Sequence, residues 1–68
     1  MLHVSLGRLA AAMGKQLPLS VLKSAAGFYI GTADECGPVS RESVEYFRSE
    51  KSAWNALQTD RWQQRTNP

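Results

Sequence analysis

The chain has very few of the residues that stabilise most proteins of its size or carry simple chemistry. Among its 68 residues there is one cysteine, Cys36, and one histidine, His3. One cysteine excludes a disulfide within the chain, and a zinc site of cysteine and histidine needs more ligands than the sequence has. A single thiol is also typical of a reducing compartment. We therefore expect a domain that is stabilised by packing or by a partner chain, with no cofactor and no metal.

The sequence also lacks a long apolar run. No stretch approaches the roughly 18 apolar residues that a membrane-spanning helix needs. The N-terminal stretch is rich in apolar residues, but His3, Arg8 and Lys15 interrupt it, and no small-residue cleavage site follows it. These features predict a soluble, cytoplasmic protein with no membrane segment and no secretory signal.

Acidic residues are missing from the first half of the chain. Arg8, Lys15 and Lys23 precede Asp34, whereas six acidic and five basic residues follow from that position onward. Such a distribution fits a contact with nucleic acid or another anionic surface, and it equally fits an ordinary solvated face. The net charge of +2 is small for a nucleic-acid-binding protein.

A catalytic set is missing as well. Cys36 has no histidine near it in the sequence to form a nucleophile pair. Glu42 and Glu45 fall on opposite faces if they lie in one strand, so they do not form a pair of carboxylates. The glycines of the chain do not follow a phosphate-binding pattern that leads into a helix. We therefore predict that the protein is not an enzyme.

Residues 2–14 favour a helix. The three alanines at 10–12 have high helix propensity, and Gly14 followed by Pro18 supplies a stop. The helix would carry a candidate interface stripe at 4-3-4 spacing, made of Leu2, Leu6, Leu9 and Met13. A stripe of this kind packs on the core or forms the seam of a homodimer.

The middle of the chain predicts an antiparallel hairpin. Strand-forming residues at 28–33 and 39–46 flank the sequence ADECGP, which has the composition of a turn. Alternation along the second strand places Arg41, Ser43 and Glu45 on one face. An isolated hairpin is only marginally stable in water, so we expect another element to cover one face.

Two further segments complete the predicted fold. Residues 19–26 fit either a short helix or another strand, and propensity alone does not decide between them. Ser49 is suited to cap a helix over residues 50–58, with a short edge strand near Trp62 as an optional addition. One or both tryptophans are expected to be buried, and the expected core residues are Ile30, Val44, Ala53 and Leu57.

Together these segments predict one small α+β domain over residues 1–68. An N-terminal amphipathic helix occupies residues 1–17. A small antiparallel β-meander of three strands, with a short fourth strand as an option, follows within residues 19–66. One C-terminal helix within that range covers the sheet, because a helix of about ten residues and a small sheet each need the other for stability.

The pattern GFYIGT…GPVSRESVEYF runs through the predicted hairpin and continues to a tryptophan and an arginine near the C-terminus. Its residues are Gly27, Tyr29, Ile30, Gly31, Gly37, Pro38, Ser40, Arg41, Glu42, Ser43, Glu45, Tyr46, Phe47, Ala53, Ala56, Leu57, Trp62 and Arg65. Over residues 19–66 the chain resembles small uncharacterised proteins of bacterial plasmids and integrative elements, a group with no activity attached to it. The resemblance implies a compact β-meander plus helix, favours a strand at 19–24, and implies an origin in a mobile element.

A binding surface is the remaining functional candidate. Its residues are Tyr29, Arg41, Ser43, Glu45 and Arg65. Arg41 would act as a bidentate donor and Tyr29 as an apolar platform. The same charges are also explained as a solvated cross-strand group that stabilises the sheet slightly.

Two functions therefore stay open. The first is a non-catalytic module that binds another protein or a second copy of itself. The second is a nucleic-acid-binding protein in which Tyr29 or Trp62 stacks on bases and the basic contacts come from Lys15, Arg41, Arg48, Arg61 and Arg65. We favour a protein partner, because acidic residues interleave with the arginines from residue 34 onward.

Overall fold

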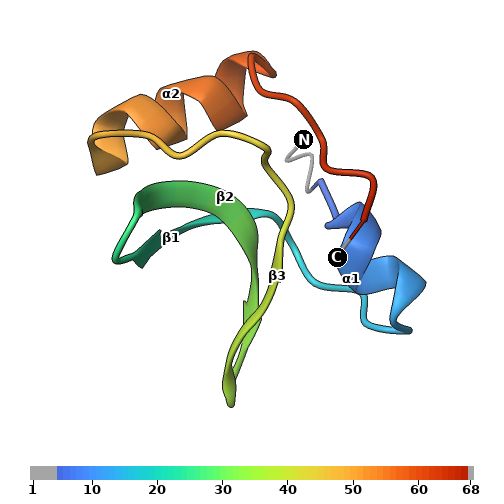
Figure 1. The fold of residues 1–68 in the computed structure, drawn as a ribbon. Coiled ribbons are helices and arrows are strands. Elements are labelled where there is room, and N and C mark those ends of the chain that lie inside the picture. Colours follow the sequence, from blue (N-terminus) through green and yellow to red (C-terminus); the bar gives the residue numbers. More distant parts are fainter. Residues whose placement is uncertain (1–4, 68) are drawn as a thin grey trace.

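The computed structural model describes residues 5–67, which contain a short helix, a three-stranded antiparallel sheet and a longer C-terminal helix (Figure 1). The elements are α1 Arg8–Ala12, β1 Ser20–Ser24, β2 Gly27–Asp34, β3 Gly37–Arg41 and α2 Glu50–Thr59. This arrangement confirms the predicted α+β fold class.

β1 and β2 form a tight hairpin, so residues 20–24 are a strand and not a helix. Val21 lies opposite Ile30, and Ser24 lies opposite Gly27. Two alanines form the turn, and Gly27 has a φ of 135°, a conformation that favours glycine. The Ser24 hydroxyl oxygen accepts a hydrogen bond from the Ala26 amide at 3.2 Å, which stabilises the turn.

β3 pairs with the second half of β2 and ends at Arg41, well before the predicted end at residue 46. The amides of Glu42 and Ser43 both donate to the Ile30 carbonyl at 2.9 Å. Two successive amides on one carbonyl are typical of a bulge, and after Ser43 the chain leaves β2 until Phe47, which pairs with Phe28. Residues 42–46 thus form a bulge between the two points of pairing with β2, and we call them the bulge segment.

The bulge segment breaks the alternation on which the predicted core depended. A strict period of two places alternate side chains inside, but a bulge ends that pattern. Val44, expected in the core, is 48% exposed, so this prediction is wrong. Glu42 and Ser43 are neighbours in the chain, and both are fully buried.

α2 begins and covers the sheet as predicted. The Ser49 hydroxyl oxygen accepts a hydrogen bond from the Ser52 amide at 3.1 Å, which caps the helix. Figure 1 shows α2 lying across β1 and β2, and both strands contact it. Ile30 and Ala53 form the centre of the core with no exposed surface, as expected, whereas Leu57 is only half-buried.

The two tryptophans differ in burial, and neither belongs to the fully buried core. Trp54 is 40% exposed on the outer side of α2, and Trp62 is half-buried in the segment that follows the helix. Ala53 and Ala56 are the buried residues of α2, so small side chains make its contact with the sheet and the Trp54 ring stays exposed. In the described residues, this C-terminal segment forms one isolated bridge, Ser43 to Gln64, and not a fourth strand.

The N-terminal helix is shorter than predicted. Before α1 the described chain is extended: Leu6 bridges to Pro18, and the Gly7 amide donates to the Leu17 carbonyl at 2.9 Å. Leu6 and Met13 are 44% and 48% exposed, while Leu9 is buried, so the predicted stripe does not form one packed face. The fourth member of the stripe, Leu2, lies outside the described residues. Pairing with the chain around Pro18 takes precedence over helix propensity here.

Candidate binding surface

Ser43 holds the bulge segment in place from the interior. Its hydroxyl oxygen accepts a hydrogen bond from the Ile30 amide at 3.0 Å, and the hydroxyl donates to the Glu45 carbonyl at 2.9 Å. Ser43 thereby replaces a backbone acceptor that the ladder loses at the bulge. The structure places this candidate surface residue in the interior, with no exposed area.

Glu42 is buried in a polar network that sequence analysis did not identify. Its carboxylate accepts hydrogen bonds from the Leu9 amide at 2.9 Å, the Ala10 amide at 3.1 Å and the Gln64 side-chain amide at 2.7 Å. The Ser40 hydroxyl donates to the same carboxylate. Burial by itself raises the pKa of the Glu42 carboxyl, but these hydrogen bonds outweigh burial and hold the pKa below its ordinary value.

The Glu42 network connects both ends of the described chain to the sheet by hydrogen bonds. Its donors come from the start of α1, from β3 and from the segment after α2, which runs back beside α1 in Figure 1. The Arg65 amide also donates to the Glu42 carbonyl at 2.7 Å. The sequence contains no local signal for this role, because the partners are far apart in the chain.

The bulge segment turns Tyr46 outward, against Arg41. The carbon centre of the Arg41 guanidinium lies 4.6 Å from the centroid of the Tyr46 ring, and its Nη1 donates to the Tyr46 hydroxyl. Tyr46 is 42% exposed. A cation over an aromatic face is a stabilising arrangement that also restricts both side chains.

Tyr29 and Arg65 also belong to this cluster: Tyr29 contacts Tyr46, and Arg65 contacts Arg41. The rings of Tyr29 and Tyr46 meet edge to face, with centroids 6.0 Å apart. Tyr29 is buried, and burial together with the neighbouring Tyr46 raises the pKa of its hydroxyl, although Arg41 acts in the opposite direction. Arg65 Nη1 donates to the Arg41 carbonyl at 3.1 Å. We call Tyr29, Arg41, Tyr46 and Arg65 the aromatic–arginine cluster.

The structure thus brings three of the five candidate surface residues together, Tyr29, Arg41 and Arg65. Ser43 is interior, and the Glu45 carboxylate is turned to the Gln63 amide, with both of its oxygens 3.1 Å away. The expected common strand face does not exist, because β3 ends at Arg41. Tyr46, the most exposed aromatic of the cluster, was missed because alternation assigned it to the opposite face from Arg41.

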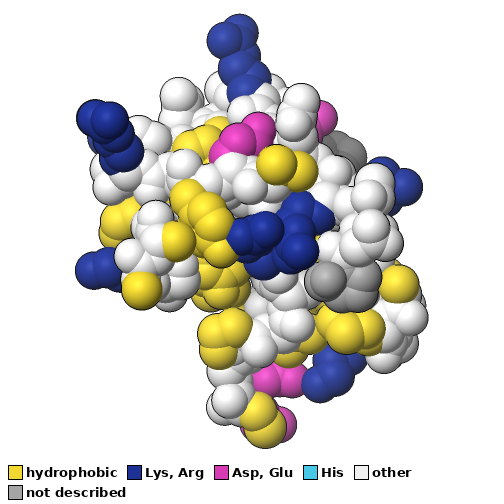
Figure 2. Space-filling view, in the orientation of Figure 1, with side chains coloured by type: hydrophobic (Ala, Val, Ile, Leu, Met, Phe, Trp, Pro, Cys, Tyr) yellow, Lys and Arg dark blue, Asp and Glu magenta, His cyan; other side chains and the backbone are white. Residues whose placement is uncertain are grey.

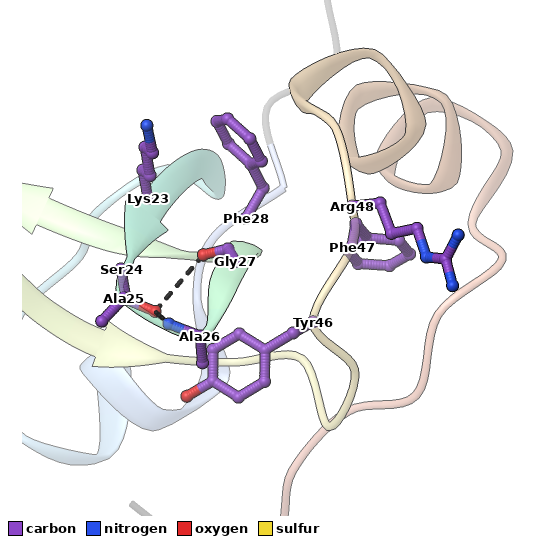
Figure 3. A pocket seen from close by; sticks show the side chains of 9 residues that line it. All are labelled: Lys23, Ser24, Ala25, Ala26, Gly27, Phe28, Tyr46, Phe47 and Arg48. Carbon is purple, nitrogen blue, oxygen red and sulfur yellow. Dashed lines mark hydrogen bonds between the residues drawn. The ribbon is translucent and has the colours of Figure 1, made fainter.

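Tyr46 also borders a hollow at the turn end of the β1–β2 hairpin (Figure 3). The hollow has a volume of about 420 Å³. Its lining comes from the hairpin turn and from the chain just before α2, and consists of Lys23, Ser24, Ala25, Ala26, Gly27, Phe28, Tyr46, Phe47 and Arg48. We call it the hairpin-end pocket. Because Tyr46 belongs to both, the pocket and the aromatic–arginine cluster form one continuous surface.

The accessible charge is more basic than the composition suggests. Over residues 5–67 the structure has a single ion pair, Lys15 Nζ to Asp34 at 2.8 Å, and Glu42 contributes no exposed surface. Figure 2 shows Lys and Arg side chains gathered in the middle of one face, beside hydrophobic side chains. Of the arginines proposed to contact nucleic acid, Arg41 and Arg65 lie together, whereas Arg48 lines the pocket and Arg61 is exposed elsewhere.

Comparison of the chain with protein-family models, with curated proteins and with solved structures finds no match. No helix within residues 5–67 has both the length and the apolar character required to cross a membrane. In the same part of the chain, no three of its histidine, cysteine, aspartate and glutamate side chains are grouped closely enough to hold a metal ion.

Proposed function

We propose that this protein is a small, non-catalytic binding module that acts in the cytoplasm by contact with another protein. The observation that carries the proposal is the aromatic–arginine cluster, in which the bulge segment turns Tyr46 outward against the partly exposed Arg41 of β3, over the buried Tyr29. Bulges in natural sheets commonly redirect a side chain at a functional site. Tyrosine and arginine are also among the residues that contribute most to protein interfaces.

The contacts of the cluster explain why it suits binding. Tyr29 and Ser43 anchor the cluster from the buried side, so Tyr46 and Arg41 lose little further freedom when a partner binds. The Nε of Arg41 is buried without a hydrogen-bond partner in the structure.

The resemblance to plasmid and integrative-element proteins supports a role in a bacterial mobile element, with a host protein as the partner.

Capture from a nuclease-treated bacterial lysate tests this proposal. The immobilised protein should retain a defined partner, and Arg41→Ala and Tyr46→Ala should each reduce its recovery by tenfold or more. Arg61→Ala is the matched control, because it removes one exposed positive charge outside the cluster and the pocket. Equal loss in all three variants, or capture that disappears with nuclease, contradicts the proposal.

Nucleic acid is the second candidate, favoured by the one observation that Lys15 alone among the basic residues at 5–67 forms an ion pair. Binding to single-stranded nucleic acid would weaken steeply with salt, with a slope of about one per neutralised phosphate. The aromatic faces argue against this function, since Arg41 already covers Tyr46 and the Lys23 Nζ lies 5.6 Å from the Phe28 centroid.

Self-association is a further form of protein contact within the proposal. Leu6 and Met13 expose 44% and 48% of their surface next to α1. Sedimentation equilibrium separates the two forms: a concentration-dependent dimer that Met13→Ser abolishes would identify a second copy as the partner.

A further inference from the structure

The hairpin-end pocket combines an aromatic wall with two cations. Phe28 and Phe47 pair with each other across the edge of β2, and Tyr46 closes one side. Lys23 and Arg48 are both exposed, and Figure 3 shows them on opposite sides of the phenylalanines. Among the described residues that line the pocket, none is acidic. The pocket is therefore apolar at its wall and positively charged at its rims.

The pocket is held in shape by the backbone. The Phe28 amide donates to the Phe47 carbonyl at 2.9 Å, which joins the two halves of the lining. A Cβ atom on Gly27 would come within 2.9 Å of the same carbonyl oxygen, so only glycine permits this approach. On the other side, the Ser24 hydroxyl donates to the Gly27 carbonyl at 3.3 Å and fixes the turn. A ligand would thus meet a preformed site.

We infer that the hairpin-end pocket binds an acidic segment of a partner protein, in which an apolar side chain is flanked by carboxylates. The apolar side chain would contact Phe28, Tyr46 and Phe47. The flanking carboxylates would pair with Lys23 and Arg48, which have no ion-pair partner in the described chain. This inference rests on the proposed function and names the chemistry of its partner.

Charge and shape favour an acidic peptide over a nucleic acid at this site. The positive charge of the pocket is limited to Lys23 and Arg48, which suits a few carboxylates and not a continuous polyanion. Lys23 covers a face of Phe28 that a base would need for stacking. A hollow of about 420 Å³ holds a few side chains and does not follow a nucleic-acid backbone.

The test uses the full chain and three fluorescein-labelled probes. The first is a short peptide with one phenylalanine between pairs of glutamates, the second replaces every glutamate with glutamine, and the third is a short oligothymidylate. Fluorescence anisotropy measures binding, and amide NMR shifts locate it. The variants are Lys23→Ala and Arg48→Ala, with Arg61→Ala as the control of equal net charge, and circular dichroism verifies that each variant is folded.

The expected result is binding of the glutamate peptide that weakens at least fivefold in Lys23→Ala and in Arg48→Ala, but less than twofold in Arg61→Ala. Amide shifts should be concentrated at residues 23–28 and 46–48. No binding of the glutamate peptide, equal binding of the glutamine peptide, tighter binding of the oligothymidylate, or equal loss in Arg61→Ala each overturns the inference. If any of these occurs while lysate capture still depends on Arg41, the proposed function stands and only the assignment of the pocket fails.

Discussion

The side chains around the two ends of β2 differ in polarity, and the usual relation between polarity and burial is reversed there. The polar side chains are buried, and the aromatic ones are partly exposed. Toward its C-terminal end, Thr32 is fully buried, and its hydroxyl oxygen lies 2.6 Å from that of Ser40, which in turn donates to Glu42. Toward its N-terminal end, Phe28 is only half-buried and the nearby Tyr46 is 42% exposed. The polar side chains around Thr32 are thus in the interior of the protein, whereas the aromatic side chains around Phe28 are partly exposed.

This difference separates what stabilises the chain from what it presents to a partner. A domain of this size has little apolar area to bury, so a fully hydrogen-bonded polar network makes part of its core. Exposed aromatics contribute less to folding than buried ones and remain available for contact. Substitutions at the polar end should therefore change the free energy of unfolding strongly and have no direct effect on binding. Substitutions at the aromatic end should weaken binding and change the free energy of unfolding little.

The largest expected effect is on folding, at Glu42. Glu42→Ala removes the acceptor of the Leu9 and Ala10 amides and of the Gln64 side chain. Buried donors left without a partner should lower the free energy of unfolding by about 3–5 kcal/mol. Urea denaturation measures this loss, and Glu35→Ala, at an exposed turn residue, is the control. A loss similar to that of the control would show that the network does not stabilise the fold.

Gly7 lies against the buried Thr32 and Glu42, so a substitution there tests how tightly the start of α1 packs on the polar network. Its backbone has a φ of −71°, which any residue adopts, so the effect of a side chain there is one of space alone. A Cβ atom would lie 2.4 Å from Thr32 Cγ2 and 2.7 Å from Glu42 Oε2. Gly7→Ala should therefore lower the free energy of unfolding by about 1–3 kcal/mol, which thermal or urea unfolding would measure. An unchanged stability would mean that α1 does not pack tightly against the network.

The pH dependence of the free energy of unfolding should come mainly from Glu42, in the same polar network. Since the pKa of Glu42 is lower in the folded chain than its ordinary value of 4.5, the folded state binds fewer protons than the unfolded state. The stabilisation is therefore present above about pH 4.5 and is lost as the pH falls toward the folded-state pKa. Glu42→Gln should flatten this acid limb, as measured by unfolding free energies between neutral pH and pH 3.

Asp34→Asn is the comparison for that experiment. The hydrogen bond from Lys15 lowers the pKa of Asp34 too, but this pair lies at the surface, with the Lys15 side chain half exposed, so its contribution should be the smaller one. An acid limb that is removed by Asp34→Asn and kept in Glu42→Gln would reverse the assignment.

The smallest effect on folding is expected at the aromatic end. Tyr46→Ala removes the contacts with Arg41 and with the edge of Tyr29, but the side chain is 42% exposed. The free energy of unfolding should fall by about 1 kcal/mol or less, while capture of the partner should fall strongly. A loss of stability comparable to that of Glu42→Ala would make Tyr46 a folding residue and remove the contrast between the two ends.

The sequence predicted those elements whose causes lie within a few residues of each other. The Ser49 cap, the alternation at 28–33 and the turn chemistry before Pro38 are local, and α2 and the β2–β3 hairpin follow from them. The candidate surface was predicted less well. Arg41 and Arg65 do lie together, but Ser43 and Glu45 were assigned by an alternation that ends with β3 at Arg41 and that the bulge segment interrupts.

What the sequence by itself determined is therefore the β2–β3 hairpin and α2, because caps, turns and periodicity act between neighbours in the chain. That residues 20–24 form a strand was decided by their pairing with β2. Only the tertiary structure decided that Glu42 is buried and that Tyr46 faces outward. Glu42 is stabilised inside by the Leu9 amide, 33 positions away, which no local pattern encodes. A buried carboxylate needs donors that converge in space, and the fold supplies them by bringing α1 and the C-terminal segment to the same edge of the sheet.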